Sequence, residues 1–341
     1  MPQEIELEFP DGKKKEYKKG TTGIEVAKSI GQRLAADALA VELNGKTIEL
    51  NEPLQESGKI KVLTWDSPEG KKALWHTAAH VLNEAVQAVF PKALPAIGPP
   101  IDEGFYFDFD VEKPFTEEDL QKIEEKMKEI ISKKPVISKK VVSISEAQKI
   151  FEKNQYKKEL IKEFAEQGKT LSVYFTGKFF DLCKGGHVED IGKIRAVKLL
   201  KTGGAYWRGS EKNKMLQRIY GIAFPEQKML DEFIEKKQKA EANSHLKLGR
   251  ELDLFSMHEE AQGNVFFHPN GASIYNELVS FLRAKQQQKG YLEVITPLIL
   301  KKELWMRSGH WDHYKQNMYF TKIDEEDYAV KPMNCPGHIL F

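Results

Sequence analysis

The first 64 residues show short apolar and polar alternations that predict a small unit of strands and a helix. IELEF (5–9) alternates with a period of two, as a half-buried strand does, and PDGKK follows as a turn. Residues 23–35 carry apolar side chains at near-helical spacing. Asn-Gly at 44–45 is the strongest short-range hairpin signal in the chain, and IKVLTW (60–65) closes the unit as a strand. Residues 1–64 are therefore expected to form a compact ubiquitin-like β-grasp module that, with no His and no Cys, binds or positions a partner and does not catalyse.

Residues 65–224 form a second unit in which helical and strand patterns are mixed. One helix is expected from about Glu69 to Phe90, and another begins after Thr116, which can cap it together with Asp119. The apolar stripe of the second helix predicts an ordinary structural helix that ends before Pro135. Strand-like runs then follow: VVSI (141–144), SVYF (172–175) and KFFDL (178–182). The pattern indicates an α+β domain.

A charged segment separates this domain from a third unit. Residues 225–244 are helical in pattern with few apolar positions, which predicts a linker helix. From residue 245 to 341 a new unit begins, and residues 271–297 read as a helix, a glycine turn and a strand that ends at Pro297. The fold class expected from these patterns is α+β and multidomain.

The charge balance and the apolar pattern argue against three classes of protein: a polycation, a secreted protein and a membrane protein. The 341 residues contain 52 Lys+Arg and 51 Asp+Glu, so the chain is not a polycation and any nucleic-acid binding must come from local patches such as 122–163. Lys runs of this kind are more often solvated faces. The N-terminus lacks a secretory apolar core and no window is apolar enough for a membrane span, so we expect a soluble, cytoplasmic protein. Cys183 and Cys335 are expected to be thiols or ligands and not a disulfide.

The first helix of the second unit has an unusual polar side. At 100° per residue, one side carries a polar set with a single full charge: His76, His80, Asn83, Glu84 and Gln87. Two histidines at i and i+4 lie roughly 5–6 Å apart at Cβ, so both imidazoles can reach one small ligand. HxxxH alone is a short motif, and two incidental surface histidines would look the same.

A second short motif follows the strand-like run FFDL. Cys183 and His187 flank a Gly-Gly pair whose flexibility allows the chain to turn and bring the two side chains together. Cys183 could also be a buried small apolar residue. With the helix-borne pair, three imidazoles and a thiolate make a formal zinc-ligand set, and the same groups could form a metal-free acid–base cluster.

Longer motifs indicate a protein family, which the two short motifs alone do not. The chain resembles the N-terminal part of bacterial threonyl-tRNA synthetases through these segments: HTAAH (76–80), GPPIDEGFYFDFD (98–110), CKGGH (183–187), GAYWRGSEKNKMLQRIYGIAF (204–224), SGHWDHYKQNMYF (308–320) and KPMNCPGHIL (331–340). The resemblance implies a TGS module at 1–64, an editing domain at 65–224, a linker helix at 225–244 and the start of a class II ligase domain at 245–341.

The resemblance also implies a proofreading pocket. In the family, residues matching His76, His80, Cys183 and His187 line a site that hydrolyses serine esterified to threonine tRNA, and they do so without zinc. By the same match Lys157, Asp181 and Tyr106 line the pocket. Lys157 or His76 is expected to orient or deprotonate the water, and Asp181 to accept from the substrate ammonium. One departure is visible: CKGGH stands where the family commonly has Cys-Arg-Gly-Pro-His, which is expected to loosen the turn before His187.

For the third unit the resemblance implies only part of a ligase site. Residues 271–297 match motif 1, which packs at the homodimer interface. Cys335 matches the first zinc ligand of the threonine pocket, while His338 is too close to it to be assumed a partner ligand. Motifs 2 and 3, which bind ATP and magnesium, are not found, so these residues alone are not expected to aminoacylate. The parent reaction joins threonine to tRNA(Thr).

Two other functions fit the residues. A stand-alone zinc-dependent aminoacyl-ester hydrolase would hold about one zinc ion per chain through the His/His/Cys/His set. A non-catalytic tRNA-binding regulatory module would bind tRNA and leave seryl-tRNA(Thr) intact. Metal analysis and a deacylation assay distinguish them.

Overall fold

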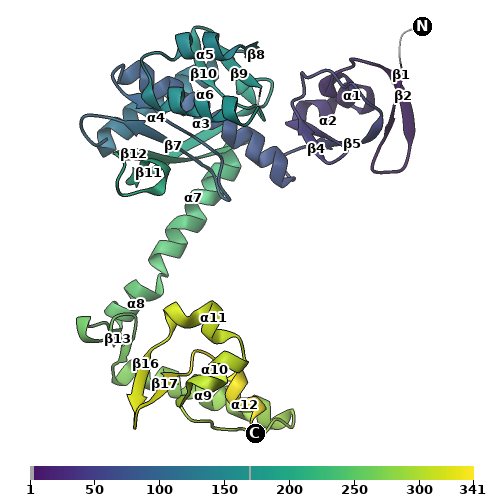
Figure 1. Ribbon diagram of the computed structural model, residues 1–341. Coiled ribbons are helices and arrows are strands. Elements are labelled where there is room, and N and C mark those ends of the chain that lie inside the picture. The colour runs from purple at the N-terminus through teal and green to yellow at the C-terminus, as the bar shows by residue number, and fades with distance from the viewer. Residues whose placement is uncertain (1–3, 169) are drawn as a thin grey trace. The chain divides into compact units, whose positions relative to one another are not determined.

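A computed structural model describes residues 4–168 and 170–341. The chain divides into two compact units, residues 1–239 and 240–341, which are described separately (Figure 1). Of the N-terminal segment tested above for a secretory signal, residues 1–3 lie outside the described part. Within that part, no helix is long and apolar enough to cross a membrane.

The first strands and helices form the small module expected at the N-terminus. Its elements are β1 (Glu4–Glu8), β2 (Lys14–Lys18), α1 (Gly23–Ile30), α2 (Gln32–Asp37), β3 (Ala40–Leu43), β4 (Lys46–Ile48) and β5 (Gly58–Leu63). They build a mixed sheet of order β2-β1-β5-β3-β4 in which β1 and β5 run parallel. The β3–β4 hairpin turns at Asn44 and Gly45, both with positive φ, so that prediction is confirmed.

The single helix predicted over 23–35 is two helices. At Gly31 the backbone is extended, with φ 175° and ψ 145°, and the residue ends α1 and begins α2. Glycine is the poorest helix former after proline, so a helix breaks there at low cost. Ala35 is still buried in the module core, on α2.

The second part of the same unit contains two antiparallel sheets. The larger has the order β11-β12-β7-β6 and the smaller β10-β9-β8. Its strands are β6 (Leu94–Pro95), β7 (Phe105–Asp110), β8 (Ile137–Val142), β9 (Leu171–Thr176), β10 (Phe179–Leu182), β11 (Ala196–Tyr206) and β12 (Met215–Phe224). Its helices are α3 (Pro68–Val89), α4 (Glu117–Ser132), α5 (Ile144–Ile150), α6 (Gln155–Glu166) and α7 (Gln227–Ala242), with short 3₁₀ turns at Ile191–Lys193 and Trp207–Gly209.

Local sequence signals set several of these boundaries. Thr116 and Asp119 form the predicted reciprocal cap of α4, which ends at Ser132 as expected before Pro135. The strand predicted through VVSI stops early: Ser143 accepts from the backbone of Glu146 and caps α5, so Ile144 is helical. A serine followed three residues later by glutamate is a helix-start signal, and it overrides the strand preference of the preceding valines.

One apolar core contains residues of α3, of the larger sheet, of α4 and of the N-terminal module. The buried face of α3 packs with Phe107 of β7 and Ile219 of β12, and α4 adds Ile123 and Met127. The same cluster contains three residues of the N-terminal module: Leu39, Ala40 and Leu63. The module and the second domain are thus packed through shared buried apolar side chains.

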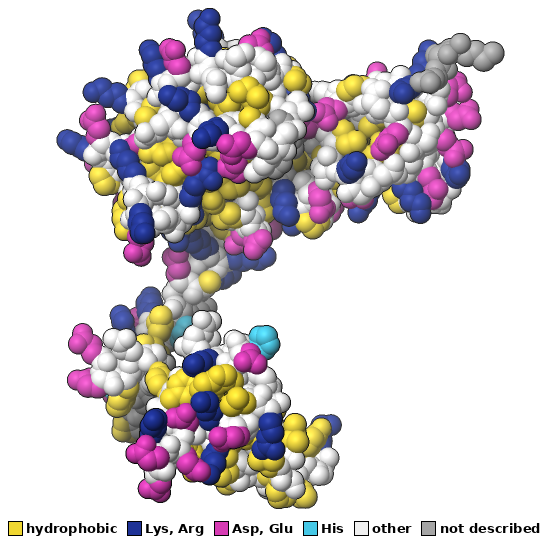
Figure 2. Space-filling model, viewed as in Figure 1, with side chains coloured by type: hydrophobic (Ala, Val, Ile, Leu, Met, Phe, Trp, Pro, Cys, Tyr) yellow, Lys and Arg dark blue, Asp and Glu magenta, His cyan; other side chains and the backbone are white. Residues whose placement is uncertain are grey.

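Residues 240–341 form a much thinner unit. Its elements are α8 (His245–Glu251), β13 (Phe255–Ser256), a 3₁₀ turn (Glu259–Ala261), β14 (Phe266–Phe267), α9 (Pro269–Gln288), β15 (Ile299–Lys301), α10 (Lys302–Arg307), α11 (His310–Tyr314), a 3₁₀ turn (Lys315–Asn317), β16 (Phe320–Ile323), β17 (Glu326–Val330) and α12 (Cys335–Ile339). Its buried apolar cluster consists of Trp305, Met318 and Ala329. Large apolar side chains gather on its visible surface (Figure 2), and Leu278, Phe281 and Leu282 of α9 are exposed.

The strand predicted to end at Pro297 is not formed. Residues 291–297 have no regular secondary structure, and Leu292 and Ile295 are 90% and 91% exposed. A strand requires a hydrogen-bonded neighbour, and in the described part of the chain none pairs with this segment. The first pairing comes later, where β15 joins β17.

Candidate functional site

Helix α3 supplies two imidazoles at fixed spacing. Ser67 caps the helix by accepting from the Gly70 N–H at 3.2 Å, and Pro68 occupies the first turn, where a missing N–H costs nothing. Its apolar residues face the core and leave His76 and His80 one turn apart on another side, with ring centroids 5.1 Å apart. The helical repeat alone therefore fixes this half of the site.

A loop after β10 supplies the thiol and the third imidazole. The Cys183 N–H donates to the carbonyl of Ser172, which holds the start of the loop to β9. Gly185 and Gly186 then take φ of +108° and +92°, values that side chains rarely adopt. This turn returns the chain so that His187 Nε2 lies 3.2 Å from Cys183 Sγ.

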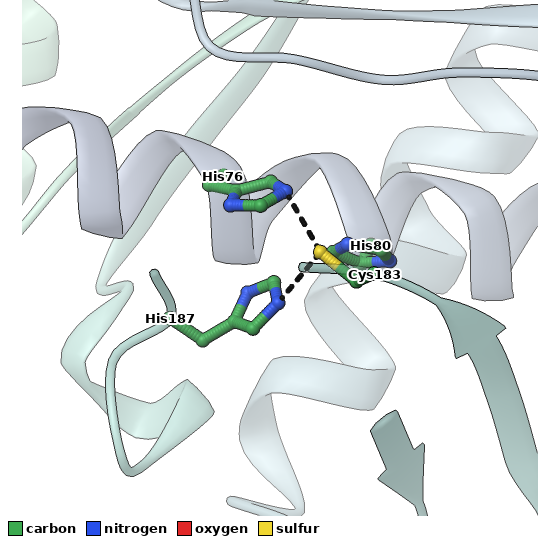
Figure 3. A group of neighbouring side chains, drawn as sticks. All are labelled: His76, His80, Cys183 and His187. Atoms are coloured by element: carbon green, nitrogen blue, oxygen red, sulfur yellow. Dashed lines mark hydrogen bonds between the residues drawn. The ribbon is translucent and has the colours of Figure 1, made fainter. Parts of the chain in front are cut away.

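The two halves meet in one place. Cys183 Sγ lies 3.3 Å from His76 Nε2 as well as close to His187, so the sulfur stands between two rings (Figure 3). The His76 and His187 ring centroids are 4.3 Å apart, and those of His80 and His187 are 4.8 Å apart. Candidate donor atoms of all four residues lie within 4.8 Å of one another. The geometry that the two short motifs required is present.

Asp181, at the end of β10 just before the loop, contacts His80 and Asn83 of α3. Its Oδ1 lies 2.5 Å from the Lys157 ammonium, and its Oδ2 lies 3.0 Å from His80 Nδ1 and accepts from the Asn83 side chain at 2.8 Å. Asp181 and Lys157 are both buried. A carboxylate already engaged by these donors is suited to orienting His80, and has little capacity left to receive a substrate ammonium.

Burial and neighbours push the histidines in opposite directions. Burial lowers the pKa of His76 to about 4 and holds the pKa of His187 well below its ordinary value, in the latter case helped by the adjacent His76 and His80. Burial also acts on His80, but Cys183 and Asp181 outweigh it and raise the pKa of that imidazole. For Asp181 the Lys157 charge overcomes burial and lowers the pKa. At neutral pH the site thus holds a neutral His76 beside an imidazole that retains its proton more readily.

Two nitrogen atoms of the site are left open. Within the described residues, three buried ring nitrogens have no hydrogen-bond partner: His80 Nδ1, His80 Nε2 and His187 Nδ1. His80 Nδ1 still lies 3.0 Å from Asp181 Oδ2 as an ion pair, so the other two are the open positions. Buried polar atoms are seldom left unpaired, because each lost hydrogen bond costs about 1–3 kcal/mol. These atoms mark where a ligand or water would be bound.

Tyr106 lies apart from this cluster. Its ring stacks under Arg218, whose Cζ is 3.6 Å from the ring centroid and whose guanidinium pairs with Asp108. On β7 the neighbouring Phe107 faces the core, where its ring centroid is 6.4 Å from that of His80. Because successive strand residues point to opposite faces, Tyr106 points away from the face that carries His80.

The four residues, and not Cys335, offer a metal-like donor set. In the described part of the chain, the one group of three or more such donors is His76, His80, Cys183 and His187. Three imidazoles and a thiol are zinc ligands, and a carboxylate on the remote His80 nitrogen is the usual support for a ligating histidine. Tetrahedral zinc holds donor atoms about 3.3–3.8 Å apart, a spacing that follows from its bond lengths, so the set would have to contract. Cys335 is exposed and belongs to no such group.

Much of the positive charge on α4 is neutralised locally. Lys126 and Lys133 pair with Glu129, and Lys128 pairs with Glu124. Charges of both signs are interspersed on the visible face of the molecule (Figure 2). The lysine-rich stretch 122–163 therefore supplies less free positive charge than its composition indicates.

Three residues near the site were given no role from the sequence. Asn83 was placed on the polar stripe of α3 but given no role, and it is fully buried against Asp181. The Tyr174 ring stacks on His187 with centroids 4.4 Å apart, and its strand pattern gave only a structural reading. Glu49, from the N-terminal module, reaches the loop, and no local signal marks it.

Comparisons with known proteins place the chain. The family described as "TGS domain" matches residues 5–64, and the "Threonyl and Alanyl tRNA synthetase second additional domain" matches residues 171–220, which include Asp181, Cys183 and His187. The expected resemblance is thus confirmed, as is the multidomain α+β architecture at the level of these two domains.

Relatives match along nearly the whole chain. The threonine–tRNA ligase of Caldanaerobacter subterraneus subsp. tengcongensis is 52% identical over 97% of this chain and 51% of its own length. Those of Carboxydothermus hydrogenoformans and Desulforamulus reducens are 50% and 51% identical over 98% of this chain and 53% of theirs. The chain spans about half the length of these relatives and is similar to their N-terminal portion.

One solved structure is also similar in sequence. The RNA binding domain of threonyl-tRNA synthetase from Cryptosporidium parvum Iowa II is 41% identical, covers 28% of this chain and 24% of that one, and has a TM-score of 0.28.

Proposed function

We propose that this chain, similar to the N-terminal portion of threonine–tRNA ligases, hydrolyses serine wrongly esterified to tRNA(Thr). The observation that carries the proposal is the meeting of the α3 imidazole pair with the Cys183–His187 loop, around two unpaired buried nitrogens. Lys157 and Asp181 form a buried ion pair beside this cluster. Tyr106, on the other face of β7, is assigned to substrate contact outside the cluster.

A separate hydrolytic site is needed because binding alone discriminates poorly between threonine and serine. Serine differs from threonine by one methyl group, and a missing methyl is worth only about 1–3 kcal/mol of discrimination, or roughly 10–200-fold. A site that must reject serine more strongly needs a second step. A small cavity that admits serine and excludes the extra methyl of threonine provides it.

The site's proton states suit ester hydrolysis. Neutral His76 accepts a proton from the attacking water, which adds to the ester carbonyl carbon. His80, held by Asp181 and prone to keep its proton, faces the developing oxyanion. The carbon–oxygen bond to the ribose then breaks, and the protonated His76, more acidic than an ordinary imidazolium, returns its proton to the leaving ribose oxygen. Lys157, paired with Asp181 and buried, fixes that carboxylate instead of acting as the base.

Deacylation of seryl- and threonyl-tRNA(Thr) by the intact chain tests the proposal. We expect seryl-tRNA(Thr) to be hydrolysed and threonyl-tRNA(Thr) to be spared. His76→Ala and Cys183→Ala should each lower the rate, the former by about 100-fold or more, because a positioned acid–base group contributes about 10²–10⁴-fold. Unchanged rates in both variants, or a wild-type chain that leaves seryl-tRNA(Thr) intact, would refute it.

A zinc-dependent hydrolase is the second candidate, supported by the donor set itself. His76, His80, Cys183 and His187 would hold the ion, which would supply an activated water. In the metal-free proposal, the deacylation rate is unchanged by EDTA or 1,10-phenanthroline and purified chain carries no stoichiometric zinc. About one bound zinc per chain, together with loss of activity on chelation, favours the second candidate.

The activity of the whole protein is a broader proposal. We propose that it ligates threonine to tRNA(Thr) in the cytoplasm with ATP and magnesium, as a homodimer through residues 271–297 and with zinc held by Cys335. The relatives' names and the exposed apolar residues of α9 support this. ATP–pyrophosphate exchange should show no turnover with residues 1–341 alone; turnover would contradict the incomplete ligase site assigned to 245–341.

A further inference from the structure

The loop that carries His187 is held by a side chain from the N-terminal module. Glu49 follows β4 and is half-buried. Its Oε1 accepts from the N–H of Gly186 at 2.7 Å, from the N–H of His187 at 3.0 Å and from the Tyr174 hydroxyl at 2.9 Å. These partners lie 125 to 138 residues away in the sequence, so the contact is created by the fold alone.

The glycine turn creates the binding place for this carboxylate. Successive N–H groups that converge on one side of a turn form a concavity that binds anions. Gly185 and Gly186, with positive φ, give the chain that shape, and the two N–H groups that follow both point to Glu49 Oε1. Hydrogen bonds to an ionised carboxylate are shorter and about twice as strong as neutral ones. The loop is thus fixed by an outside charge.

The same contact controls the His187 ring. Tyr174, whose hydroxyl donates to Glu49, stacks edge-on against His187. Glu49 therefore positions the backbone of His187 and the aromatic wall beside its imidazole together. The Nε2 of that imidazole lies 3.2 Å from Cys183 Sγ. A displaced loop would move His187 away from both the sulfur and the α3 pair.

The module also has contacts with the second domain that do not involve Glu49. Leu39, Ala40 and Leu63 share a buried core with α3, and the Lys193 ammonium donates to the carbonyl of Ala36. Glu52 also pairs with Lys139 of β8. Loss of the Glu49 carboxylate should therefore leave the module in place and affect the loop alone.

We infer that Glu49 is a positioning residue through which the TGS module sets His187 for hydrolysis of the seryl ester. The inference rests on the proposed function for its effect on rate, but the contact itself is independent of that function. It gives the N-terminal module a defined task in proofreading: it supplies the carboxylate that binds the N–H groups of Gly186 and His187 at the turn.

The first test observes the contact without any reaction. Gly residues labelled with ¹³C at the carbonyl and His labelled with ¹⁵N select Gly-His pairs, of which the sequence has three: 186–187, 309–310 and 337–338. The signal lost in His187→Gln identifies the pair of interest. In Glu49→Ala its amide proton should move upfield while the other two stay, and Glu52→Gln should leave all three unchanged. An unmoved His187 signal in Glu49→Ala overturns the inference.

The second test measures deacylation of seryl-tRNA(Thr) by the same variants. Glu49→Ala should lower kcat by about tenfold or more with little change in KM, since misplacement of about 1 Å can cost up to 10²-fold. Glu49→Gln, which keeps an acceptor without the charge, should fall between. Glu52→Gln, the matched control, should equal the wild type. A moved amide with an unchanged rate overturns the positioning role.

The two tests separate failure of the inference from failure of the proposed function. If the wild type does not hydrolyse seryl-tRNA(Thr), the proposed function fails and the positioning role for that reaction fails with it, even where the amide test confirms the contact. If the wild type is active and the rate falls equally in Glu49→Ala and Glu52→Gln, general weakening of the interface explains the result, and the specific role of Glu49 is overturned.

Discussion

The two halves of the candidate site, the His76–His80 pair on α3 and the Cys183–His187 pair on the loop, are positioned in different ways. The α3 half rests on a helix of 22 residues whose backbone hydrogen bonds set the spacing of His76 and His80, and Asp181 then orients the His80 ring. The loop half places Cys183 and His187 through a turn of two glycines, and its shape depends on Glu49 from another module. The helix is a local solution, while the loop is a solution that only the tertiary structure provides.

This difference teaches where the site is sensitive. A helix loses stability in small increments when a cap or a surface residue changes, and its histidines stay aligned. A turn with positive φ either forms or does not. Changes should therefore have the largest effect where the halves are joined, less in the loop, and least in the helix.

The largest effect is expected at the junction, in Asp181→Asn. Removal of this charge leaves the buried Lys157 ammonium unpaired, and breaking a buried ion pair costs about 3–5 kcal/mol. Hydrogen exchange of the α3 amides in the intact chain should show that loss, and deacylation should be abolished. The double variant Lys157→Met/Asp181→Leu should recover stability but not activity. Recovery of both would mean that Asp181 has no role in catalysis.

A smaller effect is expected within the loop, in Gly185→Ala. At φ of +108° an added Cβ meets the Tyr174 hydroxyl oxygen at 2.8 Å, and such backbone strain costs about 1–3 kcal/mol. Seryl-tRNA(Thr) deacylation should fall by about tenfold or more through displacement of His187. Gly177→Ala is the matched control: φ is +60° and the space is open. Equal rates for the two variants would contradict the claim that loop shape limits the reaction.

The helix half should tolerate Ser67→Ala. Loss of this cap removes the bond to the Gly70 N–H and should lower the stability of α3 by about 1 kcal/mol. The deacylation rate should not change, because His76 and His80 lie more than two turns beyond the cap. Ser67→Asp, which keeps an acceptor, should restore the hydrogen-exchange protection. A fall in rate with Ser67→Ala would show that the helix is not the independent half described above.

The smallest effect is expected from mild acid. Because the His76 pKa is lowered to about 4, the imidazole stays neutral at pH 6, where one with a pKa of 6.5 would lose about three-quarters of its neutral form. The deacylation rate should thus change little from pH 7 to 6. The lowered pKa of His76 also affects the free energy of unfolding. The neutral ring stabilises the folded state above pH 6.5, and that contribution is lost as the pH falls toward 4. His76→Asn should remove this part of the pH dependence of stability. A deacylation rate that halves near pH 6.5 would contradict the lowered pKa of His76.

The parts of the fold that could be predicted are those encoded by neighbouring residues. The Asn44-Gly45 hairpin and the Thr116–Asp119 cap are local geometry. The i, i+4 spacing of His76 and His80 is equally local, which is why half of the site was visible as a stripe. The meeting of the two short motifs needed the family resemblance, since spacing along the chain does not say where a loop folds.

The parts that could not be predicted depend on partners far away in the sequence. Leu292 and Ile295 have strand-like residue types, but no neighbouring strand pairs with them in the described chain, so the predicted strand is absent. Replacement of the family's proline by Gly186 was expected to loosen the turn. Instead the N–H that proline would lack donates to Glu49, and the φ of +92° is one that proline cannot adopt.

The burial of Leu39, Ala40 and Leu63 against α3 has a practical consequence for engineering. A chimaera that exchanged the first 64 residues for those of another protein would have to carry matching apolar side chains where the module packs on α3. Otherwise it would expose the apolar face of the helix that bears His76 and His80. The end of β5 at Leu63 is therefore not a suitable boundary for exchanging the module alone.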